Sequence, residues 1–184
     1  MNIVETVRTH VLKRYSERDD AQGMDMYDTH VKYVVEYAKE LAKKLNANEE
    51  VVEIAALMHD IARVDWSNET HHIDGANYAE KYLTKLGYDS KKIAMVKHCI
   101  IAHRGSQSIP RETIEAECVA SADAMAHFRS IPDMIYYVYV DLGKELEEGK
   151  TMLKDKFERS FRKMIPEAQE IVREKYEAAM VILS

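Results

Sequence analysis

Cysteine, glycine, proline and tryptophan are scarce in this chain of 184 residues, which contains two, six, three and one of them, respectively. Cys99 and Cys118 are too few to build a disulfide framework or a paired-cysteine metal site, so we expect two buried thiols. No apolar run approaches the roughly 20 residues needed to cross a bilayer, and the N-terminus lacks the basic-then-apolar order of a signal peptide. We therefore expect a cytoplasmic protein without a membrane partner.

The chain also lacks an excess of positive charge. Its formal net charge is -6 and its pI is about 5.8, whereas proteins that bind large nucleic acids usually present a basic face. The composition therefore disfavours a large nucleic acid as partner. A small nucleotide stays open, because a local pocket or a metal ion can neutralise phosphate.

Alternating polar and apolar stretches flanked by turn residues, which would indicate strands, are missing as well. Helix-forming residues dominate instead. We expect Asp28 to cap a helix that runs to about Leu45, and Asn48 to cap one that runs to about Val64. Pro110 suits the first position of a later helix. The sequence therefore predicts an all-α fold.

The length predicts a single domain over residues 1–184. Residues 134–142 are rich in aromatic and β-branched side chains, but we assign them to a helix because nothing nearby could pair with them as a strand. Residues 150–183 contain two charged amphipathic segments that separate near Pro166. These segments predict a C-terminal helical appendage.

Four polar side chains lie in segments that otherwise have the composition of a buried core. His59 and Asp60 are adjacent in "AALMHDIARV", His30 borders an apolar helical stripe, and Asp123 lies among small residues in "CVASADAMA". A carboxylate is costly to bury unless it is paired, neutralised or bound to a metal. Imidazole and carboxylate are the expected ligands of Mn, Fe, Co, Ni or Zn, so one divalent cation would account for all four residues.

The order of these residues resembles the HD-domain superfamily of metal-dependent phosphohydrolases, in particular its small stand-alone members. The resemblance rests on "ALMHDIAR", on "HHIDGANYAEKYL" and "VKHCIIAHR", and on "ASADAMAHF". It covers about residues 20–130; Ala62 and "SADAMAH" depart mildly from the usual motifs, while the ligand types are kept. It implies an HD-type helical bundle on which residues 131–184 pack as C-terminal helices.

By this resemblance, His30, His59, Asp60 and Asp123 would hold a divalent transition metal (Mn, Fe, Ni, Co or Zn), with one or two ions per chain. A metal-activated water would attack a small phosphorylated substrate such as a nucleotide, and Asp60 could also orient that water. A di-iron HD-type oxygenase and a non-catalytic nucleotide-binding module stay open as alternatives. The charged C-terminal helices could cover the pocket or mediate a homodimer.

Further histidines follow the motif. Two-metal members of the superfamily take extra ligands from these regions, so we expect His72 and His98 to hold a second metal or to contact phosphate. His98 and His103 are about 140° apart around a helix and cannot face one ion unless the helix ends between them. We therefore assign His103, beside Arg104, to substrate, and expect His71 to act as a cap or to be exposed.

Two residues follow metal-ligand candidates at a spacing of four. Arg63 comes four residues after His59, and we expect it either to hold a substrate phosphate or to pair with a nearby carboxylate. His127 comes four residues after Asp123, and we expect a packed surface residue there. Asp60, Arg63 and His103 are therefore the predicted catalytic residues.

Overall fold

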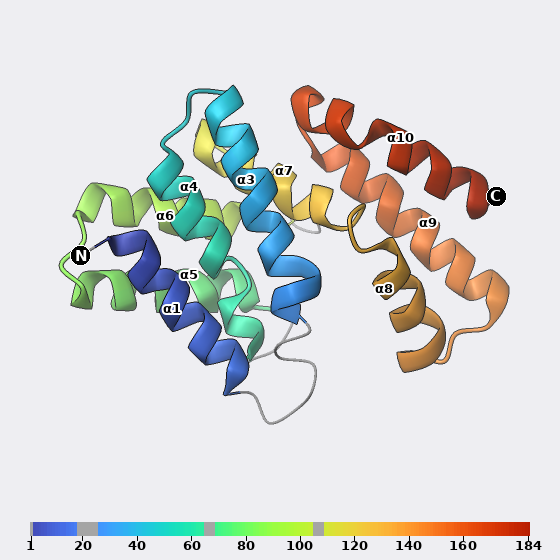
Figure 1. Cartoon of the computed structure of the whole chain (residues 1–184), viewed down its shortest axis with the longest axis horizontal. Helices are drawn as coiled ribbons and strands as arrows, with labels where there is room; N and C mark the ends of the chain where they lie inside the picture. The colour runs from blue at the N-terminus through green and yellow to red at the C-terminus, as the bar shows by residue number, and fades with distance from the viewer. Residues whose placement is uncertain (1, 18–25, 65–68, 105–108) are drawn as a thin grey trace.

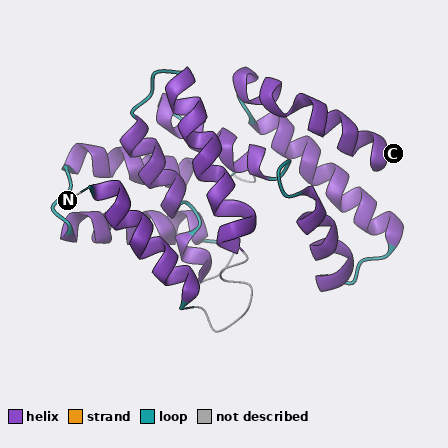
Figure 2. Cartoon of the chain, viewed as in Figure 1, coloured by secondary structure: helices purple, strands orange, loops and turns teal. Residues whose placement is uncertain are grey.

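The computed structural model describes residues 2–17, 26–64, 69–104 and 109–184. Within these ranges the chain forms helices joined by short turns and contains no strand (Figure 2). This confirms the prediction of an all-α fold. No helix in the same ranges combines the length and the apolar character that crossing a membrane requires. The elements in chain order are α1 (Ile3–Ser16), the π-helical turn η1 (Tyr27–Val31), α3 (Lys32–Lys44), α4 (Glu49–Met58), the 3-10 turn η2 (Ile61–Val64), α5 (His71–Lys85), α6 (Ser90–Ala102), α7 (Ile114–Ala126), α8 (Ile131–Tyr136), the π-helical turn η3 (Tyr137–Asp141), α9 (Leu146–Lys163) and α10 (Pro166–Ile182).

The helices form two groups that meet at α7 (Figure 1). The core bundle, α1 to α7, includes close pairs of α5 with α6 and of α3 with α7. The C-terminal helices, α8 to α10, lie on the other side of α7, which contacts α9 and α10 as well as α3, α4 and α6. A side chain on α7 can therefore meet partners from both groups.

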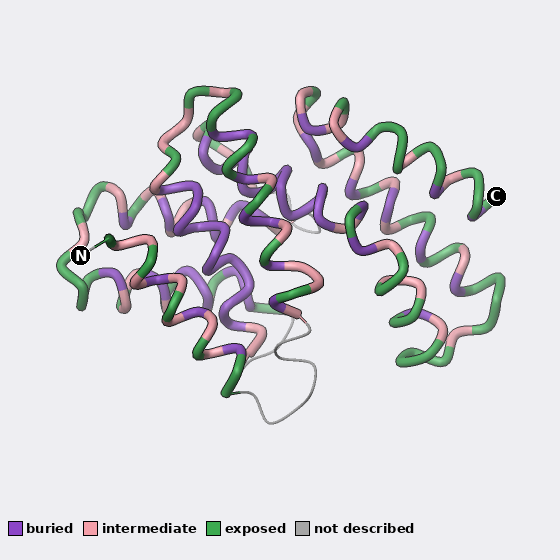
Figure 3. Tube along the Cα trace, viewed as in Figure 1, coloured by how far each residue is buried: buried purple, intermediate pink, exposed green. Residues whose placement is uncertain are grey.

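Two helices of the core bundle, α4 and α7, are enclosed by their neighbours (Figure 3). Residues 51–58 of α4 are all buried, and so is nearly all of α7. A helix that is covered on every side has to be apolar all round. This explains the aliphatic and small residues in both sequences, and it means that polar side chains in these segments must find partners inside the protein.

Two of the expected helix starts are wrong. Asp28 is not a cap, because it lies inside η1, which runs without interruption into α3. Pro110 is not the first residue of a helix either. Helix α7 begins four residues later, at Ile114, because Thr113 caps it: the Thr113 hydroxyl accepts a hydrogen bond from the backbone N–H of Ala116 (3.2 Å). The expected cap at Asn48 is confirmed, because its side chain accepts from Val51 N.

The C-terminal helices follow the sequence-based expectation. Residues 134–142 are helical except at the last position, as part of α8 and η3, and Pro166 is the first residue of α10. The junction between α9 and α10 is fastened to the core bundle, because Ile165 N donates to Ser121 Oγ on α7 (3.2 Å). Both cysteines are buried, as predicted.

Candidate metal site

The His-Asp pair lies where α4 ends. The helix stops at Met58 and the turn η2 follows, so the prediction of a helix as far as Val64 is wrong. His59 Nδ1 lies 2.8 Å from the carbonyl oxygen of Ala56, which a continued α-helix would offer to the N–H of Asp60. Adjacent side chains on a helix diverge by about 100°. His59 Nε2 and Asp60 Oδ2 nevertheless come within 3.5 Å of each other, so both side chains reach over the edge between their two directions.

The first cluster consists of the four residues that the sequence singled out. His30, from η1, has its Nε2 atom 3.3 Å from His59 Nε2 and 3.9 Å from Asp60 Oδ2. Its Nε2 atom also lies 3.2 Å from Asp123 Oδ1, which projects from α7. Three separate segments thus bring two imidazoles and two carboxylates together. His30 lies in a π-helical turn, a local widening of the helix that often occurs at functional sites.

A second cluster lies on the other oxygen of the same aspartate. Asp60 Oδ1 is 3.4 Å from His71 Nε2 and 3.6 Å from His103 Nε2, and these two nitrogens are 3.3 Å apart. His103 follows the last residue of α6, and its Nδ1 atom is 2.6 Å from the carbonyl oxygen of Ile100. Asp60 therefore joins the two clusters, with Oδ2 toward the first and Oδ1 toward the second.

The second cluster corrects the expectations for several histidines. His71 is not exposed: it is buried at the start of α5 and faces Asp60. His103, which we had assigned to substrate, is a candidate metal ligand, because its Nε2 atom lies near Asp60 Oδ1 and His71 Nε2. His72 follows His71 on the helix and points elsewhere, with its Nδ1 atom 3.4 Å from an Arg104 guanidinium nitrogen.

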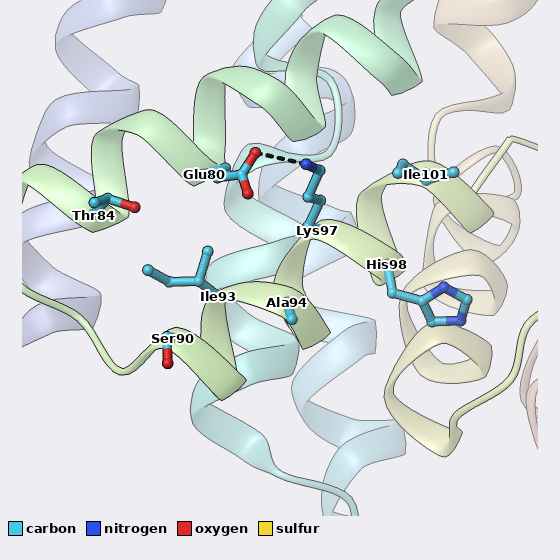
Figure 4. Close-up of a pocket in the computed structure, with 8 residues that line it drawn as sticks. All are labelled: Glu80, Thr84, Ser90, Ile93, Ala94, Lys97, His98 and Ile101. Atoms are coloured by element: carbon cyan, nitrogen blue, oxygen red, sulfur yellow. Dashed lines mark hydrogen bonds and ion pairs between the residues drawn. The ribbon is translucent and has the colours of Figure 1, made fainter.

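His98 is separate from both clusters. Its Nε2 atom accepts a hydrogen bond from Glu112 N (3.0 Å). The residue lines an open groove of about 480 Å³ along α5 and α6, beside Ile101 (Figure 4). Among the described residues, the groups that could hold a metal include neither His98 nor His72. Their expected role as second-site ligands is therefore not supported by the positions of their side chains, whereas the expected contact to phosphate stays a prediction. The separation of His98 from the second cluster agrees with the predicted angle between His98 and His103.

Burial and charge set the protonation states of the first cluster. Burial lowers the pKa of His59 to about 4, so its imidazole is neutral at neutral pH. Burial alone would raise the pKa of Asp60, but His59 and Arg63 outweigh this effect and hold the pKa well below its usual range. The pKa of Asp123 is low for the same kind of reason, with Lys163 as the main opposing charge. Neutral imidazole and ionised carboxylate are the forms that bind metals.

The surroundings of Asp60 Oδ1 indicate whether a metal ion would fit between the clusters. This buried oxygen accepts no well-formed hydrogen bond within the described part of the chain. Arg63 Nε lies 3.1 Å away and forms an ion pair with it. A buried carboxylate oxygen that faces imidazole nitrogens without a hydrogen bond calls for an explanation. A divalent cation supplies one, because donors within 4.8 Å of one another are offered by His30, His59 and Asp60 and, on the other side, by Asp60, His71 and His103. Asp123 meets the same distance with His30 and His127.

Three residues near Asp123 have roles that the sequence did not reveal. The His127 ring stacks on His30 (centroids 5.4 Å apart), and its Nδ1 atom is 3.0 Å from Ser160 Oγ on α9. Lys163 Nζ, also from α9, donates to Asp123 Oδ2 at 2.5 Å. Burial lowers the pKa of Lys156, whose charge interacts with those of Asp123 and Arg63. The spacing of His127 was a signal, whereas the two lysines belong to a charged pattern that looks like a solvated helix face.

Comparison with known proteins places this arrangement in a family. The model of the HD domain family matches residues 27–127, which contain every residue of the two clusters. Among curated proteins, a tRNA (cytidine(56)-2'-O)-methyltransferase of Thermoplasma volcanium is 35% identical over 109 residues. That alignment takes in 54% of this chain and 31% of the relative, so the chain spans less than a third of the relative's length.

Solved structures share the fold over most of the chain. YpgQ of Bacillus subtilis in complex with ADP has a TM-score of 0.68 at 20% identity, and covers 95% of this chain and 90% of its own. The Lin1889 protein of Listeria innocua has a TM-score of 0.70 at 17% identity, with 98% and 93% covered. A predicted HD superfamily hydrolase from an uncultured Thermotogales bacterium has a TM-score of 0.58 at 24% identity, with 84% of each chain covered. At these identities the likeness is one of fold.

Proposed function

The chain belongs to the HD-domain family, and on this basis we propose that it is a metal-dependent phosphohydrolase that acts on a small phosphorylated substrate such as a nucleotide. The observation that carries the proposal is the position of Asp60, whose two oxygens face two sets of imidazole nitrogens. We propose that each cluster holds one divalent cation, with Asp60 shared between them. His30, His59 and Asp123 complete the first site, and His71 and His103 the second.

The residues of the two clusters suit phosphoryl transfer to water. Divalent cations bound there would lower the pKa of a coordinated water toward neutrality and polarise a phosphoryl oxygen. Asp60 holds the two sites in a fixed relation. The hydrogen bonds that His59 and His103 make through Nδ1 to backbone carbonyls fix the rings and turn the Nε2 lone pairs inward.

Cationic side chains at the edge of the clusters would bind the substrate's phosphate. The Arg63 side chain is 38% exposed and pairs with Asp60, so its guanidinium lies between the buried cluster and solvent. Lys156 carries a second positive charge that interacts with Arg63 and Asp123. Phosphoryl transfer depends mostly on positioning and charge neutralisation. We propose that both groups donate to phosphate oxygens and leave metal binding to the histidines and aspartates.

A nucleotide is the first substrate class to test. The structure of YpgQ contains ADP, and the fold likeness supports looking for the same class of compound here. The methyltransferase relative does not support a proposal of methyl transfer. Its alignment spans 31% of that protein, so the activity in its name can reside outside the shared part.

Elemental analysis of protein purified without chelator would test the metal sites. We expect two transition-metal ions per chain in the wild-type protein, and one in a His71→Ala variant, which loses a ligand of the second cluster. His98→Ala is the matched control, because it removes a histidine that lies outside both clusters, and its metal content should equal that of the wild type. A His98→Ala variant that loses metal while His71→Ala retains it would contradict the assignment.

Release of inorganic phosphate or pyrophosphate would test the reaction. We expect hydrolysis of at least one compound in a panel of nucleoside mono-, di- and triphosphates and sugar phosphates. Activity should disappear with a chelator and return with Mn²⁺ or another divalent ion. Metal-loaded protein that consumes oxygen and hydrolyses no member of the panel would replace the proposal with the di-iron oxygenase.

A further inference from the structure

The two oxygens of Asp123 have different partners. Oδ1 faces the first cluster, 3.2 Å from His30 Nε2 and 4.0 Å from His59 Nε2. Oδ2 faces away from it and accepts a hydrogen bond from Lys163 Nζ at 2.5 Å. Lys163 belongs to α9, outside the part of the chain that the HD family model matches. A residue of the C-terminal helices is thus in direct contact with a candidate metal ligand.

The position of Lys163 is fixed independently of this ion pair. Its backbone carbonyl accepts a hydrogen bond from an Arg111 guanidinium nitrogen (2.7 Å). Two residues later, Ile165 N donates to Ser121 Oγ, which lies on the same helix as Asp123. The Lys163 side chain itself is 8% exposed. The end of α9 is therefore fastened on two sides, and the ammonium group is held against Oδ2.

This arrangement has two consequences for an ion bound at the first cluster. A carboxylate can bind a cation through one oxygen or both, and the bond from Lys163 keeps Oδ2 occupied. The ammonium charge also repels a cation that Oδ1 binds, and because both groups are largely buried, this repulsion is screened less than it would be in water. Without a metal, the same ammonium balances the charge of Asp123.

We propose that Lys163 is a positioning residue that restricts Asp123 to ligation through Oδ1 and weakens the hold of the first site on its metal ion. Through Lys163, the C-terminal helices lower the metal affinity of the first site and keep one coordination position of the ion free for water or substrate. This inference rests on the proposed metal site. It makes α9 part of the functional unit although α9 supplies no ligand.

Metal affinity of a Lys163→Met variant would test the inference. Competition with a chromophoric chelator should show that the variant binds Co²⁺ or Mn²⁺ about tenfold or more tightly than the wild type, because the opposing charge is gone and Oδ2 is free. Lys163→Arg keeps the charge and should bind like the wild type. Lys154→Met is the matched control on the same helix, since Lys154 is exposed, and it should leave affinity unchanged.

The visible spectrum of the Co²⁺ form separates positioning from simple support of the fold. Absorption by Co²⁺ weakens as its coordination number rises. If Asp123 gains a second bond to the ion in Lys163→Met, the absorption per bound Co²⁺ should fall, and Lys163→Arg should restore it. Equal or weaker affinity in Lys163→Met, with an unchanged spectrum, would overturn the proposal.

These measurements distinguish a wrong role of Lys163 from a wrong metal site. If the wild-type protein binds no divalent ion, the metal site itself is wrong, whatever the variants do. If the wild type binds metal and Lys163→Met does not tighten it, the role of Lys163 is wrong and the metal site stands. Lys163→Gln, which retains a hydrogen-bond donor but no charge, replaces Lys163→Met if that variant does not fold, and should bind more tightly for the same electrostatic reason.

Discussion

The core bundle supplies every candidate ligand of the two clusters, whereas the C-terminal helices supply cations to the same site. All candidate metal ligands of the two clusters lie within residues 27–127, in the core bundle, and each carboxylate among them is buried. The C-terminal helices contribute the ammonium groups of Lys156 and Lys163, both on α9. The candidate ligands therefore all come from the core bundle, whereas the cations near them come from both parts: Arg63 from the core bundle, and Lys156 and Lys163 from α9 across α7.

The two parts also differ in how a helix is buried. In the core bundle, α4 and α7 are covered on all sides, so a polar residue there stands out in the sequence. In α9, one face is buried, through Leu153 and Phe157, and the rest is charged. A lysine that turns inward looks like its exposed neighbours in such a pattern. The buried candidate ligands of the first cluster are thus visible in the sequence, whereas the two lysines of α9 are not.

Removing one carboxylate from the core bundle and one from α9 should give the largest difference in metal content and turnover. Asp60→Ala takes away the residue that both clusters share, and we expect it to lose bound metal and to reduce turnover by about a thousandfold or more. Asp155→Ala removes an exposed carboxylate of α9 and should change neither. Metal content and phosphate release measure the two effects, and circular dichroism checks that both variants stay helical. Unchanged activity of Asp60→Ala would refute the metal assignment.

Acid should destabilise the metal-free protein through His59. In the unfolded chain its pKa is near 6.5, whereas burial lowers the folded-state pKa to about 4. The unfolded state therefore takes up the proton first, and as the pH falls from about 6.5 to about 4 the free energy of unfolding should decrease by about 3 kcal/mol. Urea unfolding at several pH values, with chelator present, would measure this decrease. In a His59→Gln variant, the free energy of unfolding should depend less on pH in this range. If it changes with pH equally in both proteins, His59 is not the cause.

The cations from the two parts should have similar, smaller effects on substrate binding. Arg63→Ala, in the core bundle, and Lys156→Met, on α9, should each raise KM for a phosphorylated substrate by about tenfold, because each removes one charged contact to phosphate. Steady-state kinetics and metal analysis of the same samples would check this. If only Arg63→Ala raises KM, then the C-terminal helices act on the metal site and do not reach the substrate. An equal loss of metal in Arg63→Ala would mean that Arg63 supports the ligands.

Much of the first cluster could be predicted from the sequence. His30, His59, Asp60 and Asp123 stood out because each interrupts an apolar helical segment, and burial of such a group without a partner is costly. The second cluster was predicted less well. His71 and His72 are neighbours at the start of α5, and nothing in their composition tells which one turns inward. The role of His103 could not be predicted either, because the sequence does not show that α5 and α6 bring His71 and His103 to the same oxygen of Asp60.

The sequence by itself determined the helical fold and the chemistry of the first cluster, because helical periodicity and the cost of buried charge act locally. It could not determine which groups from distant segments meet. The approach of His30 to His59, Asp60 and Asp123, and the approach of Lys163 to Asp123, were decided by the tertiary structure. Both depend on contacts between elements far apart in the chain. A shift of a few ångströms in such a contact would turn an ion pair into two solvated charges, and local sequence patterns do not set that distance.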